Sequence, residues 1–417
     1  MRSSSMFRSL RHRNAQLFFG GLMVSNIGTW MQMTAMSLVV YELTGKATDT
    51  GITLLCQFLP MLLLGSWAGA VADRHSKRKM ALLTQSLQAA QAIALGGFVL
   101  AGVVNLPLLY GLSFVLGLVN AFDNPARRGF VTELVEPDDI GNALSLNTAV
   151  MTGSRVVGPA LAAVLKEPLG AGWLFMLNGL SFAAIVGSLL LIDRSQLRPA
   201  PRAARGGTPV RDALRFIGSD RHLRTIFIVF TVVGTFAFNY SVSLLKLSDI
   251  RFDSTVGFGL LLAATGLGSV IGSLLTGARP IVTPAWFLGS GVLLGVSGIA
   301  LAWSPNLTAA LVLSVPVGMG GAAFIAAQNV IVQQESPDDM RGRLLALGAV
   351  AFLGSTPIGA PITGLVADHV SAEWSLAYGS VTTLGAVAVG ALVLRPALGR
   401  ANESAARPSV PTSADAH

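Results

Sequence analysis

The sequence predicts an all-α membrane protein with twelve transmembrane helices arranged as two six-helix bundles. Three observations carry this prediction: a shortage of charge, twelve apolar runs of membrane-spanning length, and a short element repeated in both halves. Of the 417 residues, 52% are hydrophobic and 12% are charged, and the mean hydropathy is +0.63. A soluble domain carries about twice that share of charge, so the composition indicates a chain that faces lipid.

The apolar runs place the helices along the chain, because about 20 apolar residues span a bilayer. Backbone groups in hydrocarbon must bond within their own segment, so the runs are helices rather than strands. The first six cover 17–41, 50–72, 80–102, 107–130, 142–165 and 172–192, and the second six cover 222–245, 256–278, 284–303, 307–333, 344–366 and 375–395.

These runs divide the chain into an N-terminal bundle (1–192), a cytoplasmic linker (193–221), a C-terminal bundle (222–395) and a cytoplasmic tail (396–417) that we expect to be disordered. The linker is rich in Pro, Gly and Arg, and its part from Val210 to Ser219 has the pattern of an amphipathic helix lying on the membrane surface.

The distribution of basic residues predicts the orientation. Most of the 29 Lys and Arg residues lie in segments that share one face, and the opposite loops hold only Lys46, Lys166, Lys246 and Arg251. Basic loops stay in the cytoplasm, so both termini are expected there. We expect a monomer in the bacterial inner membrane, with the lipid bilayer as its surroundings. The net charge of +8 forms no patch with interleaved aromatic residues, so nucleic acid is not expected as a partner.

A repeat supports the division into halves. The segment Glu136-Pro137-Asp138-Asp139-Ile140 recurs 200 residues later as Ser336-Pro337-Asp338-Asp339-Met340, each time before a predicted helix. Both of these helices carry a late glycine–proline element, Gly158-Pro159 in one and Gly359-Ala360-Pro361 in the other. Because both copies enter from the same side, the halves are predicted to be parallel repeats.

Signatures of enzymes and metal sites are missing from the sequence. Cys56 is the single cysteine, the five histidines fall in loops or tails, and no Walker A, H-E-x-x-H or G-x-S-x-G element occurs. We therefore expect no enzyme activity, no metal and no cofactor.

The sharpest motif follows the second predicted helix, in the segment GAVADRHSKRK. It resembles the signature G-x-L-a-D-R-x-G-R-K of the major facilitator superfamily, with Gly69, Asp73, Arg74, Lys77 and Arg78 in register, whereas Ser76 replaces the second glycine and Val71 the leucine. The resemblance extends over the whole chain and implies the fold of that superfamily. It also implies that this loop acts as a gating latch that holds the halves together in the outward-open state.

An acidic residue low in the fourth helix completes the latch in such proteins, and Asp123 fits by position. A carboxylate at that depth needs a partner, for which Lys77 and Arg155 are the candidates. A proton-titrating role for Asp123 is the alternative.

The fifth helix carries a second motif, GSRVVGPALAA, which is similar to the antiporter motif of drug-exporting facilitators. Its members are Gly153, Arg155, Gly158 and Pro159, with Ala162-Ala163 in place of the usual glycine pair. The resemblance implies a small-residue face that seals against leak, and ordinary close packing is the other interpretation. Arg155 lies near the predicted midplane, so it is expected to face the bundle interior or water. It is a candidate for binding an anionic substrate, for proton coupling or for pairing with Asp123.

Further candidates are weaker. Glu42, near the outer end of the first helix, is the second choice after Asp123 as a coupling acid. Eight residues lie at depths where a substrate cavity forms, although each alone is more often a packing contact: Asn26, Trp30, Gln57, Asn178, Asn239, Tyr240, Gln328 and Asn329.

Together the motifs resemble the drug/proton antiporter branch that holds macrolide-efflux and enterobactin-exporter-like proteins, the transmembrane secretion effector type. The resemblance implies export of a small amphipathic molecule against proton entry by alternating access. An importer or facilitator of a small polar solute is one alternative, and a transport-inactive scaffold or sensor is another.

Overall fold

The computed structural model describes residues 8–198 and 209–406 of the chain, and all regular secondary structure in these ranges is helical. The all-α prediction is thus confirmed there. The N-terminal half contains α1 (Arg13–Thr44), α2 (Ala47–Arg74), α3 (Lys77–Leu100), α4 (Leu106–Glu133), α5 (Ile140–Leu169) and α6 (Ala171–Leu191), with the short 3-10 turns η1 (Arg8–Arg11), η2 (Pro137–Asp139) and η3 (Arg194–Gln196).

The C-terminal half begins after the amphipathic helix α7 (Pro209–Ser219), which falls where the linker pattern predicts a helix. It contains α8 (Arg221–Ala237), α9 (Tyr240–Phe252), α10 (Thr255–Gly277), α11 (Pro284–Ala302), α12 (Leu307–Glu335), α13 (Asp338–Leu353), α14 (Thr356–His369) and α15 (Ala372–Ala406). Two predicted spans, 222–245 and 344–366, are each formed by a pair of helices, α8 with α9 and α13 with α14.

Local chemistry explains these two breaks. Between α8 and α9, the side-chain amide of Asn239 donates to the Thr235 carbonyl at 2.8 Å and so takes the place of a backbone donor. Between α13 and α14, Pro357 enters the first turn of α14. Proline has no N–H to continue the helical ladder, so a new helix starts there.

Several other helices begin at a polar cap. Asn105 and Asn306 occupy corresponding positions before α4 and α12, and each side chain accepts a hydrogen bond from the backbone N–H three residues on. Ser76 and Asp220 cap α3 and α8 in the same way. Such caps satisfy amides that have no partner within the helix.

Within the described residues, ten segments are both long enough and apolar enough to cross a membrane. Of the twelve predicted spans, α1 and α3 are the two outside this set. Both are long, but α3 carries Gln85, Gln88 and Gln91 in addition to the basic residues at its start, which lowers its hydropathy. These glutamines are buried within the bundle, so they do not face lipid.

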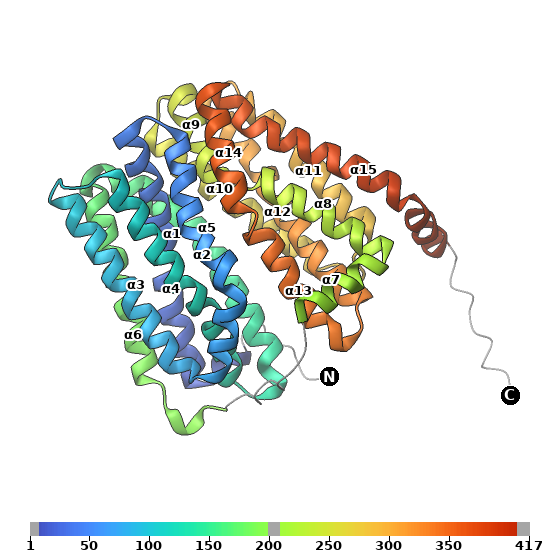
Figure 1. Ribbon diagram of the computed structural model, residues 1–417, viewed down its shortest axis with the longest axis horizontal. Helices are drawn as coiled ribbons and strands as arrows, with labels where there is room; N and C mark the ends of the chain where they lie inside the picture. Colours follow the sequence, from blue (N-terminus) through green and yellow to red (C-terminus); the bar gives the residue numbers. More distant parts are fainter. Residues whose placement is uncertain (1–7, 199–208, 407–417) are drawn as a thin grey trace.

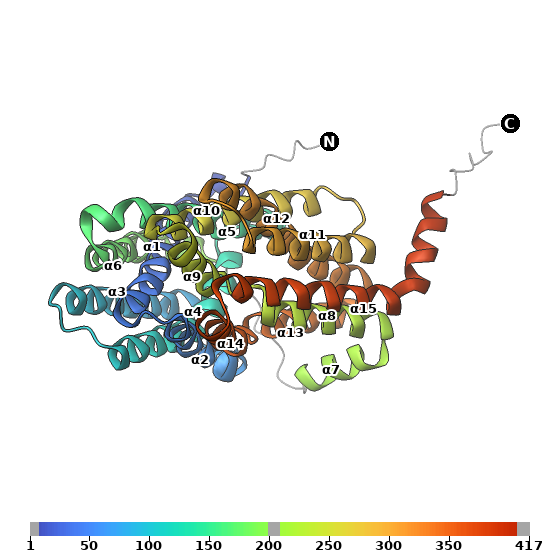
Figure 2. The same cartoon turned by 90° about the horizontal axis from the view of Figure 1, so that it is seen from above.

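The two halves pack alike. Helix α2 packs on α4 as α10 packs on α12, and α3 packs on α6 as α11 packs on α15. Figure 1 shows the N-terminal helices grouped on one side and the C-terminal helices on the other, and Figure 2 shows the same division from above. This correspondence is what parallel repeats require.

The tail departs from its prediction. Residues 396–406, expected to be disordered, continue helix α15 to Ala406, and residues 407–417 lie outside the described part. Four of its eleven residues are Ala, which has the highest helix propensity, and the segment extends an existing helix.

Candidate functional site

The two halves meet chiefly through two helix pairs, α2 with α14 and α5 with α10. A Cβ added at Gly259 of α10 would lie 2.7 Å from the Pro159 carbonyl oxygen of α5, and one at Gly51 of α2 would overlap the Ala360 carbonyl of α14. The glycine–proline elements of the repeat, which contain Pro159 and Ala360, therefore occupy equivalent places in the two interfaces. These contacts involve the start of α2 and α10 and the later part of α5 and of the span formed by α13 and α14, so they lie toward one end of the molecule.

We call this end the far end. It contains the α1–α2 turn at Gly45 and the end of α14, whereas the opposite, linker end contains η3 and α7. At the far end Asp368 of α14 accepts hydrogen bonds from the backbone amides of Ala47 and Thr48 at 3.0 and 2.8 Å, and from the Thr48 hydroxyl at 2.7 Å. A carboxylate from one half thereby caps α2 of the other.

Two more contacts join the halves at the far end. The Tyr41 hydroxyl of α1 donates to Asp249 of α9 at 2.6 Å. The Lys246 ammonium lies 3.3 Å from Asp368, donates to the Gly45 carbonyl at 3.2 Å and sits over the Tyr41 ring. Charge-assisted bonds of this kind are about twice as strong as neutral ones.

Toward the linker end, the face of α5 that meets the other half becomes open. Along this face Ala163 and Pro159 are buried, whereas Arg155, Thr148 and Ser145 are exposed. Figure 1 shows the two groups of helices diverging in the same direction, toward α7 and α13. The halves are thus joined at the far end and separated toward the linker end.

Arg155 lies where the joined part ends. Its backbone carbonyl is 2.9 Å from the position of a Cβ at Gly266 of α10, and its guanidinium lies 5.0 Å from the centre of the half-buried Trp30 ring of α1. Among the described residues it has no carboxylate partner. The expectation that Arg155 pairs with Asp123 is wrong. Arg155 and Trp30 instead present a cation and an aromatic ring, side by side, to the space between the halves.

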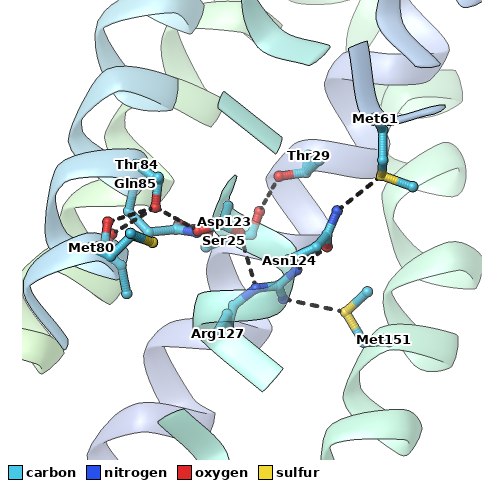
Figure 3. Close-up of polar contacts among 11 residues, drawn as sticks. Ser25, Thr29, Met61, Met80, Thr84, Gln85, Asp123, Asn124, Arg127 and Met151 are labelled. Atoms are coloured by element: carbon cyan, nitrogen blue, oxygen red, sulfur yellow. Dashed lines mark hydrogen bonds and ion pairs between the residues drawn. The ribbon is translucent and has the colours of Figure 1, made fainter. Parts of the chain in front are cut away.

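Asp123 is the centre of a polar cluster inside the N-terminal bundle (Figure 3). Its side chain is 2% exposed. One carboxylate oxygen accepts from the Thr84 hydroxyl at 2.7 Å and the Gln85 amide at 2.9 Å, and the other accepts from Nε of Arg127 at 3.1 Å. The partner of Asp123 is therefore Arg127, one turn along α4. The i,i+4 spacing was visible in the sequence and is the signal that predicts this pair.

Arg127 links this cluster to the next helix. Its guanidinium also donates to the Asn124 side chain at 3.3 Å and contacts the Met151 sulfur of α5 at 3.4 Å (Figure 3). The polar cluster around Asp123 thus extends to α5, the helix that meets the other half.

Lys77 has a different partner from the one expected. Its ammonium lies 3.5 Å from Glu133, at the end of α4, because the loop after α2 runs beside the last turn of α4 and not beside Asp123. Arg78 is buried and donates to the carbonyls of Leu189 and Leu190 at the end of α6. Lys77 and Arg78 thus bind within the same half, at the negative ends of two helices.

Other members of the loop motif make fewer contacts. A Cβ added at Gly69 would meet no described atom within 4 Å, so close packing does not require this glycine in the present conformation. Arg74 is exposed, and the side chain of Asp73 lies outside the described residues.

The motif on α5 divides in the same way. A Cβ at Gly158 would overlap Trp30 and lie 2.8 Å from the Ile27 carbonyl of α1, whereas one at Gly153 would meet no described atom within 4 Å. Gly158 therefore lets α5 approach α1, and Pro159 and Ala163 form the contact with α10.

The remaining candidates lie mostly inside the bundles. Asn178 is buried and donates to Gln32 at 2.8 Å, and Asn239 is buried in the break between α8 and α9. Both side chains serve helix packing in this conformation. Glu42 pairs with Lys166 of the same half.

The other polar candidates differ in burial. Gln57 and Asn329 are half-buried, Asn26 is 8% exposed, and Gln328 is fully buried with neither of its side-chain atoms bonded among the described residues. The hydroxyl of Tyr240 is also buried and unbonded among them. Of the eight, Trp30 is the one that lies against Arg155.

The sequence of the chain is similar to those of known membrane transporters. The family described as transmembrane secretion effector matches residues 4–415. The staphyloferrin A transporter of Staphylococcus aureus is 22% identical over 84% of this chain and 89% of its own length. The multidrug efflux pump Tap of Mycolicibacterium fortuitum is 25% identical over 83% and 87%, and the macrolide efflux protein A of Streptococcus pyogenes is 22% identical over 87% and 92%.

Solved structures share the fold. A bacterial homologue of the human lysosomal transporter Spinster, in an inward-facing and unoccupied conformation, aligns with a TM-score of 0.67 at 15% identity, over 95% of this chain and 99% of that one. A POT family transporter in complex with 5-aminolevulinic acid aligns with a TM-score of 0.74 at 12% identity, over 93% and 97%.

Proposed function

Because the chain belongs to the transmembrane secretion effector family of the major facilitator superfamily, and so is a membrane transporter of a small molecule, we propose that it exports a drug-like or siderophore-like amphipathic compound by proton antiport. The relatives named above bear the names of macrolide and multidrug efflux pumps and of a siderophore transporter. Their common feature is a small molecule of mixed polar and apolar character.

The observation that carries the proposal is the asymmetry of the interface. The halves are joined at the far end by Asp368, Tyr41 and the paired glycine–proline contacts. The face of α5 from Arg155 back to Ser145, toward the linker end, is exposed. In the proposal the linker end faces the cytoplasm of a bacterial cell and the chain acts as a monomer in the inner membrane. The present conformation is then open to the cytoplasm and ready to receive substrate.

Substrate binds between the halves beside Arg155 and Trp30 in this scheme. The guanidinium recognises an acidic or polar group, and the indole supplies an apolar surface. Closure at the linker end and release of the far end then carry the substrate outward. The two states must differ by only a few kcal/mol for such motion to be reversible.

Asp123 is the proposed coupling acid. When its carboxylate is ionised, it accepts a charge-assisted hydrogen bond from Arg127, which fixes the position of the guanidinium. Protonation of Asp123 weakens this hydrogen bond. The guanidinium can then move toward α5, where it already contacts Met151. Proton occupancy is thus transmitted to the helix that forms the seal between the halves.

The loop after α2 is the proposed latch of the alternate, outward-open state. Gly69, Asp73, Arg74, Lys77 and Arg78 are its members, and we assign Glu133 rather than Asp123 as the acid that positions it, because Lys77 lies against Glu133. In the present conformation the linker end is open, so the loop is not expected to hold the other half.

Everted membrane vesicles test the proposal. With the lumen acidified and monitored by a proton-sensitive dye, addition of a macrolide, a cationic dye or a carboxylate siderophore should release protons and concentrate the compound inside. Vesicles with Asp123→Asn should bind the compound without proton release. Substrate flux with an unchanged dye signal would refute antiport, and accumulation in intact cells instead of resistance would indicate an importer.

A further inference from the structure

A small polar cavity lies inside the N-terminal bundle, next to Asp123 and apart from the space between the halves. Its volume is about 40 Å³, and it is lined by side chains of α1, α3, α4 and α6, among them Asn26, Gln88, Asn120, Asp123, Arg127 and Phe182. None of the roles given above to Asp123 and Arg127 explains why their surroundings are hollow and polar.

The amide nitrogens of two residues lining the cavity lack a hydrogen-bond partner in the described part of the chain. Nδ2 of Asn26 and Nε2 of Gln88 are buried and make no hydrogen bond among the described residues, although the two residues are only 8% and 3% exposed. Buried polar groups in proteins are nearly always bonded, so each of these donors requires an acceptor that the neighbouring helices do not supply.

The chemistry of the lining selects water as this acceptor. An anion would be repelled by the Asp123 carboxylate, and a cation is disfavoured because Arg127 already neutralises that carboxylate. Water accepts from both amides and donates to a carboxylate at the same time. One water needs about 10–15 Å³, so the cavity of about 40 Å³ has room for at least two.

The cavity also reaches from a buried acid to partly exposed groups. Asp123 is almost fully buried, whereas Thr29, Asn120 and Arg127, which line the same cavity, are half-buried. A chain of waters here would therefore connect the carboxylate with the edge of the bundle.

We propose that Asn26 and Gln88 hold ordered waters in this cavity and that these waters are the route by which a proton reaches and leaves Asp123. A hydronium at the outer water passes a proton along the hydrogen bonds to the inner water, which protonates the Asp123 carboxylate; both waters are neutral again, and Arg127 keeps its charge. The proton route rests on the proposed coupling role of Asp123, but the water site does not.

The first test is for water, and it needs no variant. Synchrotron hydroxyl-radical labelling of the full-length protein in nanodiscs generates radicals from bound waters as well as from solvent. Phe182 lines the cavity and is 2% exposed, and Phe175, on the same helix, is 0% exposed and lies outside the cavity lining. Phe182 should be labelled at least several-fold faster than Phe175. Equal slow rates would overturn the water site and the route with it.

The second test is for the route. Asn26→Leu and Gln88→Met replace the amides by apolar side chains of similar size. Both variants should reduce the labelling of Phe182, and they should reduce proton release on substrate addition about tenfold. Substrate exchange at equal pH should continue. Gln91→Met removes a buried amide of the same helix that binds Gln32 and not the cavity, and should leave proton release unchanged. Asn26→Ala and Gln88→Ala, which keep space for water, should be affected less than Asn26→Leu and Gln88→Met.

The outcomes separate the two proposals. Undiminished proton release in a variant whose Phe182 labelling has been lost would overturn the route. A wild-type protein that transports substrate but moves no proton would overturn the route together with antiport. In that case Phe182 labelling still decides on the water site.

Discussion

The carboxylate of Asp368 accepts a hydrogen bond from the backbone amide of Thr48 at 2.8 Å, although 320 residues separate the two in the sequence. This bond, with the two others that Asp368 accepts from the first turn of α2, ties the end of α14 to the start of α2 in the other half. The residue before α2, Lys46, provides no side-chain cap, so Asp368 supplies the cap for that helix. Opening of the far end must break this contact.

Replacement of Asp368 by Asn should therefore favour the outward-open state. The substitution removes the charge and one acceptor oxygen and weakens the pair with Lys246. Hydrogen bonds to a charged group contribute about 1.5–3 kcal/mol, so the population ratio of the two states should change at least about tenfold. Spin labels at Leu43 and Ile250, both exposed and on opposite halves, report the distance across the far end by double electron–electron resonance.

A carboxylate at the same end serves as the control. Asp253 is exposed and adopts a left-handed backbone conformation that Asn also tolerates, so Asp253→Asn should leave the distance distribution as in the wild type. If Asp368→Asn likewise leaves it unchanged, the cap does not contribute to closure of the far end.

Within the α5 motif, replacement by Ala should be harmful at Gly158 and without effect at Gly153. Gly158→Ala places a methyl group against Trp30 and the backbone of α1, whereas Gly153→Ala enters open space. Overpacking costs about 1–3 kcal/mol, so Gly158→Ala should lower transport and thermal stability in detergent, and Gly153→Ala should change neither. Fluorescence-detected size-exclusion after heating, with flux in vesicles, measures both. Equal effects at the two positions would contradict the packing explanation.

The fold follows largely from hydropathy and from the repeated Pro-Asp-Asp element, because lipid allows few architectures for long apolar runs. Long-range partners could not be predicted in this way. The i,i+4 spacing of Asp123 and Arg127 is a local signal for their pair, but we expected Lys77 or Arg155 as the partner of Asp123. Lys77 meets Glu133 only because of the path taken by the loop after α2. The contact of Asp368 with α2 depends on how two bundles dock, and no sequence pattern contains that information.

Asp123→Asn should separate transport from proton coupling. The amide retains the shape of the carboxylate and a bond from Thr84, but it cannot exchange a proton and it leaves the Arg127 guanidinium without its charged partner. We expect proton-driven accumulation to fall at least about tenfold, with substrate exchange preserved, and a loss of about 1–3 kcal/mol in stability from the unpaired guanidinium. Transport with and without a pH gradient, together with thermal unfolding, measures these effects.

The double variant Asp123→Asn with Arg127→Gln provides the control. It removes both charges, so stability should be largely recovered, because replacing both partners costs less than leaving one unpaired. Proton coupling should remain lost. Recovery of coupling in the double variant would show that Asp123 is not the titrating group.

Arg155 should govern the recognition of acidic substrates. Its guanidinium has no carboxylate partner among the described residues and lies over Trp30 at the edge of the open space. Arg155→Met should weaken binding of a carboxylate siderophore about tenfold, since a bond between charged groups contributes about 1.5–3 kcal/mol, and should leave the binding of a cationic dye unchanged. Arg155→Lys retains the charge but not the planar fork, so it should give an intermediate loss.

Arg224 is an exposed arginine at the start of α8, and Arg224→Met provides the control for loss of one positive charge elsewhere. Equal losses for acidic and cationic compounds in Arg155→Met would mean that the residue supports the seal between α5 and α10 and does not contact substrate.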